Sequence, residues 1–84
     1  MTAREKFKSL GFWNVVEEEY SIEYLDGDTK YGILCVKSIY ICKDGSVIAE
    51  EGSTDDYGNF SFELSKDLMT AIFMQLKEFG IELA

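Results

Sequence analysis

The chain has 84 residues, 46% of them apolar and 14% aromatic, which predicts one folded domain over residues 1–84 rather than a disordered segment. With 16 acidic and 8 basic residues the net charge is −8, which argues against binding nucleic acid through phosphate neutralisation. The sequence contains no histidine, so it lacks the usual general base and the usual zinc ligand.

The first ten residues are predicted to form a helix with a defined start. Thr2 and Glu5 have the spacing of a capping box, in which each side chain accepts a hydrogen bond from the backbone N–H of the other residue. Gly11 stands where a helix commonly ends in a left-handed conformation. The apolar residues that repeat at helical spacing are Ala3, Phe7 and Leu10.

Between Glu18 and Leu25 the residues alternate with the two-residue period of a β-strand. The side chains expected on one face, toward the core, are those of Tyr20, Ile22 and Tyr24. Those expected on the opposite face are Glu19, Ser21 and Glu23. Asp26-Gly27-Asp28 follows with the residues of a turn.

A second β-like segment, Tyr31–Cys42, is longer than the usual strand of about five or six residues. We therefore predict a break or bulge near Lys37-Ser38. Lys43-Asp44-Gly45-Ser46 contains the Asp-Gly pair of a tight hairpin, and Ser46–Glu50 is predicted to be the next strand.

After a polar loop at Glu51–Asn59, the segment Phe60–Leu64 alternates as a last short strand. Ser65 is predicted to cap a second helix that ends at Gly80. Its apolar stripe is predicted to consist of Leu68, Met69, Ile72, Phe73, Leu76 and Phe79. Met74 falls on the polar side of this helix.

These elements predict an α+β fold with the order α-β-β-β-β-α. The connections are too short for parallel crossovers, so the strands are expected to pair antiparallel. The economical architecture is a sheet of three to five strands with the N-terminal and C-terminal helices packed on one face. The number and order of strands between Tyr31 and Leu64 remain open at this point.

No pattern of catalytic or metal-binding residues stands out in the sequence. Cys35 and Cys42 are the only thiols, and we expect buried or half-buried packing residues rather than a disulfide or zinc site. Asp26-Gly27-Asp28 begins like a calcium loop, but Tyr31 and Lys37 stand where that loop requires glycine and glutamate. We therefore expect no enzymatic activity and no cofactor.

The chain is expected to be cytosolic and not to associate with membranes. Its longest apolar runs, such as Ile33–Val36 and Ala71–Met74, are far shorter than the ~18 residues of a membrane span. The first residues also lack the apolar segment of a signal peptide.

Charge is distributed unevenly along the chain. Residues 1–8 carry a net charge of +2 and residues 9–84 a net charge of −10. Glu19, Glu23 and Glu63 are predicted to share the sheet face opposite the helices. This face is either a solvated surface that maintains solubility or a docking face for a basic partner, including one that normally binds nucleic-acid phosphate.

Some apolar side chains are also candidates for contacts. Met74 is either an isolated exposed residue or a contact with a partner or second copy. Trp13 is expected to close the core, and Tyr57 to be the most exposed aromatic residue. The candidate partner-contact residues are Glu19, Glu23, Glu63, Tyr40 and Met74.

The two ends of the chain carry a resemblance. The opening T-A-R-E-K-F-K-S-L-G-F of Thr2–Phe12 and the closing Gln75–Gly80 resemble small uncharacterised proteins of phages and mobile elements of Firmicutes, which open with T-A-R-E-x-F-x-x-L-G-aromatic. The chain departs from that group at Phe79-Gly80-Ile81, where the group has Leu-Gly-Trp. The resemblance implies a mobile-element origin and no particular activity, although small acidic inhibitors of host machinery are frequent among such elements.

The sequence thus predicts a non-catalytic binding or regulatory protein. Its partner is expected to be a protein, and one interpretation of the acidic face is that this partner is basic. One alternative is an acidic inhibitor that mimics nucleic acid toward a basic host protein such as a defence nuclease. A second alternative is a homodimeric assembly element. We expect a monomer or homodimer that does not itself bind nucleic acid.

Overall fold

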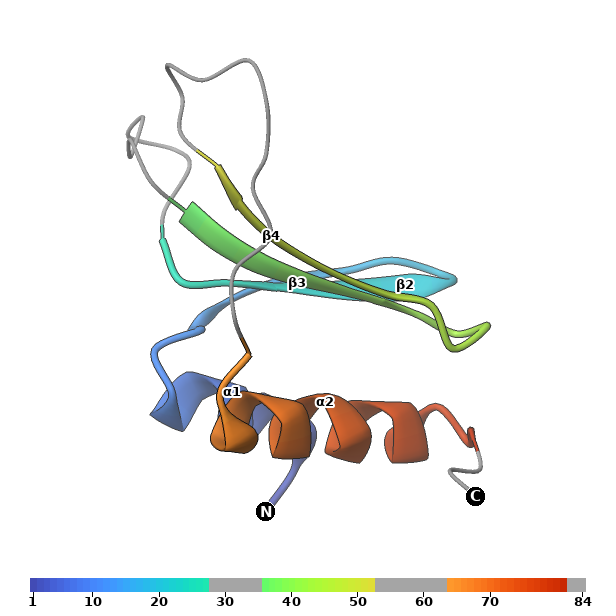
Figure 1. Ribbon diagram of the computed structural model, residues 1–84. Coiled ribbons are helices and arrows are strands. Elements are labelled where there is room, and N and C mark those ends of the chain that lie inside the picture. Colours follow the sequence, from blue (N-terminus) through green and yellow to red (C-terminus); the bar gives the residue numbers. More distant parts are fainter. Residues whose placement is uncertain (28–35, 53–63, 82–84) are drawn as a thin grey trace.

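A computed structural model describes residues 1–27, 36–52 and 64–81. Within these ranges the chain forms two layers, a four-stranded antiparallel sheet and two helices packed on one of its faces (Figure 1). The elements are α1 Ala3–Ser9, β1 Asn14–Glu17, β2 Ser21–Leu25, β3 Val36–Cys42, β4 Val47–Gly52 and α2 Lys66–Glu78. The predicted α+β class and element order are confirmed.

Helix α1 begins with the predicted capping box. The Glu5 backbone N–H donates to the Thr2 hydroxyl at 3.1 Å, and the Thr2 N–H donates to the Glu5 carboxylate at 2.9 Å. Ala3 and Phe7 are buried on the inner face of the helix. Gly11 then adopts a φ of +94°, a conformation that turns the chain toward the sheet at little steric cost.

The sheet is a meander in the order β1-β2-β3-β4, with each neighbouring pair antiparallel. Strand β1 was not predicted, because four residues are too few to reveal an alternating pattern. The strand predicted from Glu18 begins instead at Ser21, and Glu18 donates its N–H to the Ser21 carbonyl at 2.9 Å across a tight turn. Tyr20 therefore lies exposed in the β1–β2 turn instead of on the core face.

Strand β3 contains no bulge at Lys37-Ser38, so that prediction was wrong. Its register runs without interruption from Ser38 to Cys42 against β2, and from Val36 to Ile41 against β4. A regular seven-residue strand meets both neighbours here, and the first part of the predicted segment, residues 31–35, lies outside the described residues.

The β3–β4 hairpin confirms the predicted Asp-Gly turn. Gly45 has a φ of +98°, which a residue with a side chain would adopt only with strain. The Asp44 carboxylate accepts from the Ser46 N–H at 2.8 Å, and the Cys42 N–H donates to the Ser46 carbonyl at 2.9 Å. Cys42 is half-buried, as expected, whereas Cys35 lies outside the described residues.

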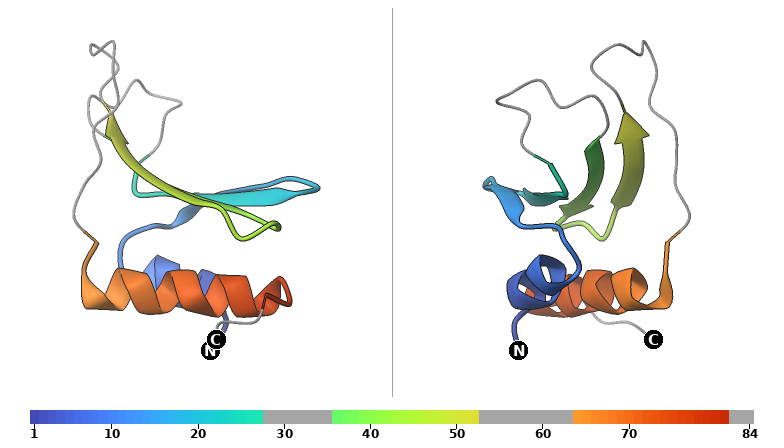
Figure 2. Two further views of the ribbon diagram at one scale, coloured as in Figure 1. Left: turned by 45° about the vertical axis from the view of Figure 1, so that its right-hand side comes forward. Right: turned by 90° about the vertical axis from the view of Figure 1, so that its left-hand side faces the viewer.

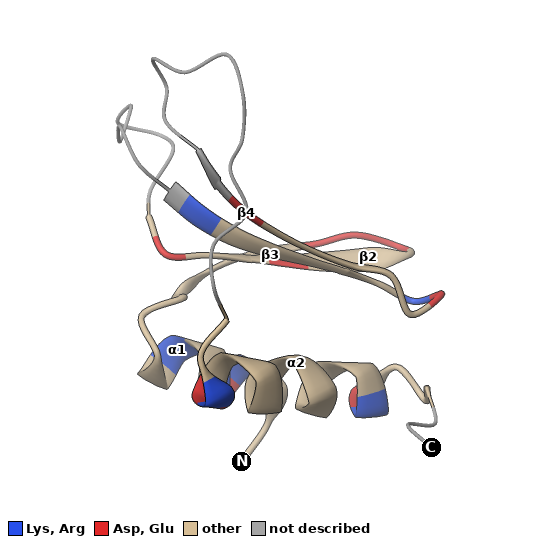
Figure 3. Cartoon of the chain, viewed as in Figure 1, with Lys and Arg blue, Asp and Glu red and all other residues tan. Residues whose placement is uncertain are grey.

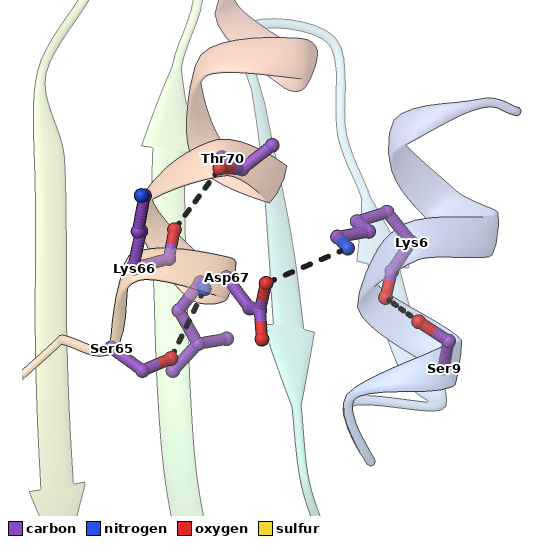
Figure 4. A network of polar contacts seen from close by, with 7 residues as sticks. Lys6, Ser9, Ser65, Lys66, Asp67 and Thr70 are labelled. Carbon is purple, nitrogen blue, oxygen red and sulfur yellow. Dashed lines mark hydrogen bonds and ion pairs between the residues drawn. The ribbon is translucent and has the colours of Figure 1, made fainter.

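Helix α2 begins as predicted, with the Ser65 hydroxyl accepting from the Leu68 N–H at 3.2 Å (Figure 4). Gly80 follows the helix with a φ of +84°. Of the predicted strand before it, residues 60–63 lie outside the described residues, as do the predicted loop aromatic Tyr57 and the predicted face residue Glu63. Leu64 is part of no strand and packs against the core.

The core lies between the sheet and both helices. The rings of Phe7 and Tyr24 stack with centroids 3.9 Å apart, and Phe12 meets Phe7 edge-on at 6.1 Å. Trp13 does not close the core, because the neighbouring Phe12 is 4% exposed and fills that place while Trp13 is 53% exposed. The buried cluster is Phe7, Phe12, Ile22, Tyr24, Ile39, Ile41, Leu68, Ala71, Ile72 and Leu76.

The buried face of α2 is rotated from the predicted stripe. Met69 and Phe73 were predicted to pack but are 42% and 49% exposed. Met74, predicted on the polar side, is half-buried. The buried residues of the helix are Leu68, Ala71, Ile72, Gln75 and Leu76.

This rotation follows from contact between the two helices, which lie side by side under the sheet (Figure 2). The Ala3 N–H donates to the Glu78 carboxylate at 2.6 Å, and Lys6 Nζ lies 3.8 Å from Asp67 Oδ1 (Figure 4). Met74 is seven residues after Asp67 and four before Glu78, so it lies on the row of α2 that faces α1. Its neighbour is therefore the first helix of its own chain.

Candidate protein interface

The candidate site is the face of the sheet that points away from the helices (Figures 1 and 2). Four residues stand opposite one another across all four strands at its centre: Val16, Glu23, Tyr40 and Ile48. We call them the outer row. Val16 and Ile48 are 43% and 48% exposed, whereas Glu23 and Tyr40 are half-buried. The outer row thus combines exposed apolar surface with a carboxylate and a phenol.

The adjacent cross-strand row makes this face only partly polar. It consists of Asn14, Leu25, Ser38 and Glu50. Leu25 is buried although it lies on the face away from the helices, while Ser38 and Glu50 are half-buried. Because Leu25 is buried by the chain itself, the accessible surface of this row belongs to Asn14, Ser38 and Glu50.

The environment of Glu23 disfavours its negative charge. Burial raises the pKa of the Glu23 carboxyl, and a hydrogen bond with Ser38 opposes this shift. The charges of Glu50 and then Glu18 raise this pKa further. A cation placed against Glu23 would relieve this repulsion, so the outer row is suited to a positively charged group.

The two layers differ in charge. Figure 3 shows acidic positions on the sheet layer, including the β1–β2 turn and β4, and basic positions on α1. The end of β1 and the turn after it carry Glu17-Glu18-Glu19, while α1 carries Arg4, Lys6 and Lys8. The negative surface is thus concentrated on the strand side of the molecule.

The structure brings together only part of the predicted contact set. Glu23 and Tyr40 are direct cross-strand neighbours, as their shared face required. Glu19 lies exposed in the β1–β2 turn, because β1 already ends at Glu17. Met74 lies in the helix layer, so it does not belong to the same surface.

Two members of the outer row, Val16 and Ile48, were missed in the sequence. Each stands beside a residue that faces the core, Val15 and Ala49 respectively. In strands, neighbouring residues point to opposite faces, so a pair of adjacent apolar residues signals that one of them faces outward. That signal was present in Val15-Val16 and Ile48-Ala49.

A hollow of about 290 Å³ lies between the layers, where the start of α1, the end of β1 and the end of α2 meet. Its lining includes Tyr24 and Gln75, and the Tyr24 hydroxyl donates to the Gln75 carbonyl oxygen. Arg4, Glu17 and Glu78 also line the hollow. Sequence reasoning missed this site, although a glutamine within an apolar helical stripe was its available signal.

The hollow contains an ion pair and a buried phenol whose pKa is raised. Arg4 and Glu17 form an ion pair at 3.2 Å in which both side chains are more than half exposed. Burial raises the pKa of Tyr24 to about 12, while the nearby Arg4 charge opposes the shift. The Tyr24 phenol therefore stays protonated near neutral pH and keeps its hydrogen bond to Gln75.

Among residues 1–27, 36–52 and 64–81, no group of three or more carboxylates or thiols gathers in a way that could hold a metal ion. Neither helix in these ranges has the length and apolar content to cross a membrane. Comparison of the chain with protein-family models, with curated proteins and with solved structures finds no match.

Proposed function

We propose that the chain is a non-catalytic binding protein that docks a basic protein partner on its outer row. The observation that carries this proposal is the placement of half-exposed Val16 and Ile48 on either side of Glu23 and Tyr40. Protein interfaces characteristically surround apolar and aromatic contacts with polar groups, and tyrosine is enriched at their centres.

The partner is basic because of the charge around Glu23. Glu18 and Glu50 both raise the pKa of this carboxyl, and a lysine or arginine of the partner would oppose that effect. The net charge of −8 would also steer a positively charged protein toward the chain. The proposal also includes a cytosolic location and a mobile-element origin. The resemblance of the two ends supports the mobile-element origin.

Docking of a protein is favoured over imitation of nucleic acid. A phosphate mimic needs an array of carboxylates, whereas the outer row places one carboxylate among three residues that offer apolar or aromatic surface. Tyr40 and Ile48 would contribute binding energy in contact with a protein partner, but they would contribute nothing to a surface that imitates phosphate groups.

Site-specific photo-cross-linking tests the proposal. A photoreactive amino acid replaces Ile48 on the outer row or, as control, Phe73 on α2; these side chains are 48% and 49% exposed. Incubation with host lysate should give an adduct with one basic protein at position 48 and none at position 73. Adducts at position 73 alone would contradict the proposal, and an adduct of twice the chain mass would indicate the homodimer instead.

A charge-reversal pair tests the basic character of the partner. Glu23→Lys should weaken binding of the cross-linked protein about tenfold, whereas Glu19→Lys makes the same charge change in the exposed turn and should have a smaller effect. Binding of the unaltered chain should also weaken as salt increases. Equal losses in both variants would show that overall charge, rather than the outer row, determines binding.

A further inference from the structure

The hollow beneath the sheet contains a polar group that the fold does not fully use. Gln75 is 4% exposed, and its carbonyl oxygen accepts from the fully buried Tyr24 hydroxyl. Its amide nitrogen has no acceptor in the described part of the chain. In that part of the chain, every side-chain nitrogen or oxygen that is shielded from solvent has a hydrogen-bond partner. The Gln75 nitrogen has none, so we infer that it is accessible from the hollow that Gln75 lines.

The Tyr24–Gln75 pair can present either a donor or an acceptor to the hollow. A phenol hydroxyl both donates and accepts, so the amide can rotate by half a turn and keep its hydrogen bond to Tyr24. After that rotation the amide oxygen of Gln75 points where the nitrogen was. The buried pair therefore adapts to the polarity of a bound group.

The charges of the lining favour a cation. Glu17 and Glu78 supply two carboxylates and Arg4 supplies one guanidinium, so one added positive charge would bring the lining to neutrality. One oxygen of Glu78 already accepts from the Ala3 N–H, and one oxygen of Glu17 contacts Arg4. Each carboxylate has a second oxygen with which to accept another hydrogen bond.

Arg4 indicates which cation suits the site. Its guanidinium is paired with Glu17 at 3.2 Å and is near enough to Tyr24 to lower the pKa of that phenol, yet the Arg4 side chain is more than half exposed. A guanidinium has five N–H donors in one plane and can reach several acceptors at once, whereas an ammonium acts as a point charge. Arg4 thus shows that the lining accommodates this group and also competes for it.

We propose that this hollow binds a guanidinium group, supplied either by a small molecule or by an arginine side chain of a bound protein. At about 290 Å³ the hollow is at the lower end of the size of ligand sites, which suits one side chain more than a large ligand. The acceptors are Glu17, Glu78 and the rotated amide of Gln75. The inference does not rest on the outer row, which lies on the opposite face of the sheet.

The test is an NMR titration of the ¹⁵N-labelled chain with methylguanidinium and, for comparison, with methylammonium. The Gln75 side-chain amide signals should shift and saturate with methylguanidinium at lower concentration than with methylammonium. Arg4→Ala should tighten methylguanidinium binding about tenfold because it removes the competing group, whereas Lys8→Ala removes the same charge from the exposed side of α1 and should not.

Glu17→Gln should weaken binding about tenfold, and Glu19→Gln, two residues away in the turn, provides the matched control. Preserved dispersion of the backbone amide signals verifies that each variant is folded. Shifts that do not saturate, or equal responses of each variant and its control, would overturn the inference.

A glycine-flanked arginine peptide distinguishes the two sources of the guanidinium. Tighter binding of the peptide than of methylguanidinium indicates a partner's arginine, because the flanking backbone adds contacts. Equal or weaker binding of the peptide indicates a small-molecule ligand. Binding at the hollow that persists in a chain with Glu23→Lys would separate this inference from the proposed outer-row function.

Discussion

Tyr24 joins three parts of the described structure through one side chain. Its ring stacks on Phe7 of α1, its backbone pairs with Ile39 of β3, and its hydroxyl donates to Gln75 of α2. Alternation along β2 was enough to predict that Tyr24 faces the core. Its polar partner lies 51 residues further along the chain, and only the packing of α2 on the sheet brings them together.

Tyr24→Phe should lower the free energy of unfolding by about 1–3 kcal/mol, because it leaves the buried Gln75 carbonyl without a donor. Chemical denaturation monitored by circular dichroism measures the change. The double variant Tyr24→Phe/Gln75→Leu should recover part of the loss, since it removes both polar partners. An unchanged midpoint for Tyr24→Phe alone would contradict the assigned hydrogen bond.

Glu23→Gln should stabilise the fold at pH 7 and have no effect in acid. The pKa of Glu23 is raised in the folded state, so the stability linked to its protonation is fully present below the unfolded value of 4.5. It is lost as pH rises through the folded pKa. The gain from Glu23→Gln at pH 7 should be below ~1 kcal/mol, because the carboxyl is partly screened by solvent.

Denaturation of both proteins at pH 7 and at pH 3 measures this difference. Glu19→Gln, which removes the same charge from the exposed β1–β2 turn, is the control and should give a smaller gain at pH 7. A loss of stability in Glu23→Gln at pH 7 would show that the hydrogen bond with Ser38 outweighs burial and repulsion.

At the scale of elements, the caps were predictable and the rotation of α2 was not. The capping box of α1, the Ser65 cap of α2 and the Gly45 turn are set by residues a few positions apart. Which flank of α2 is buried depends on where α1 lies. The contact between these two helices joins the first and last elements described. The same reasoning explains why Val16 was missed, since it lies on β1, which only its pairing with β2 defines. Ile48 lies in a strand that was predicted, so its outward position could have been found from the alternation.

Met74→Ala should destabilise the fold more than Met69→Ala. Met74 lies half-buried on the row of α2 that faces α1, and its truncation should cost about 1–2 kcal/mol, less than for a fully buried methionine. Met69 is 42% exposed on the other flank, and its truncation should change stability by less than about 0.5 kcal/mol. Thermal unfolding compares the two variants, and a larger loss from Met69→Ala would contradict the observed rotation.

For the whole molecule, the dominant property is an excess of negative charge. The net charge is −8, and on the strand side Glu50 and Glu18 lie close enough to Glu23 to raise its pKa. Like charges of this density oppose the compact state and are screened by dissolved ions. The sequence predicted this excess and placed Glu23 on the sheet face away from the helices, but it placed Glu19 on that face too, whereas Glu19 lies in the β1–β2 turn.

Sodium chloride should therefore stabilise the folded protein at pH 7, by about 0.5–1 kcal/mol between low and moderate concentration. Unfolding in urea at several salt concentrations measures this. The effect should shrink at pH 4, where more carboxylates are protonated. Destabilisation by salt at pH 7 would mean that ion pairs such as Arg4–Glu17 outweigh the repulsion.

The hydrogen bond from Ala3 to Glu78 spans 75 residues of sequence and has a consequence during synthesis. The first helix and the meander leave the ribosome well before the second helix, which is the longer of the two helices that cover the inner face of the strands. Until residue 78 has emerged, Ile39, Ile41 and Tyr24 have no complete cover. The nascent chain must therefore wait for α2 before it can reach the native state, which leaves it open to chaperones in the interval.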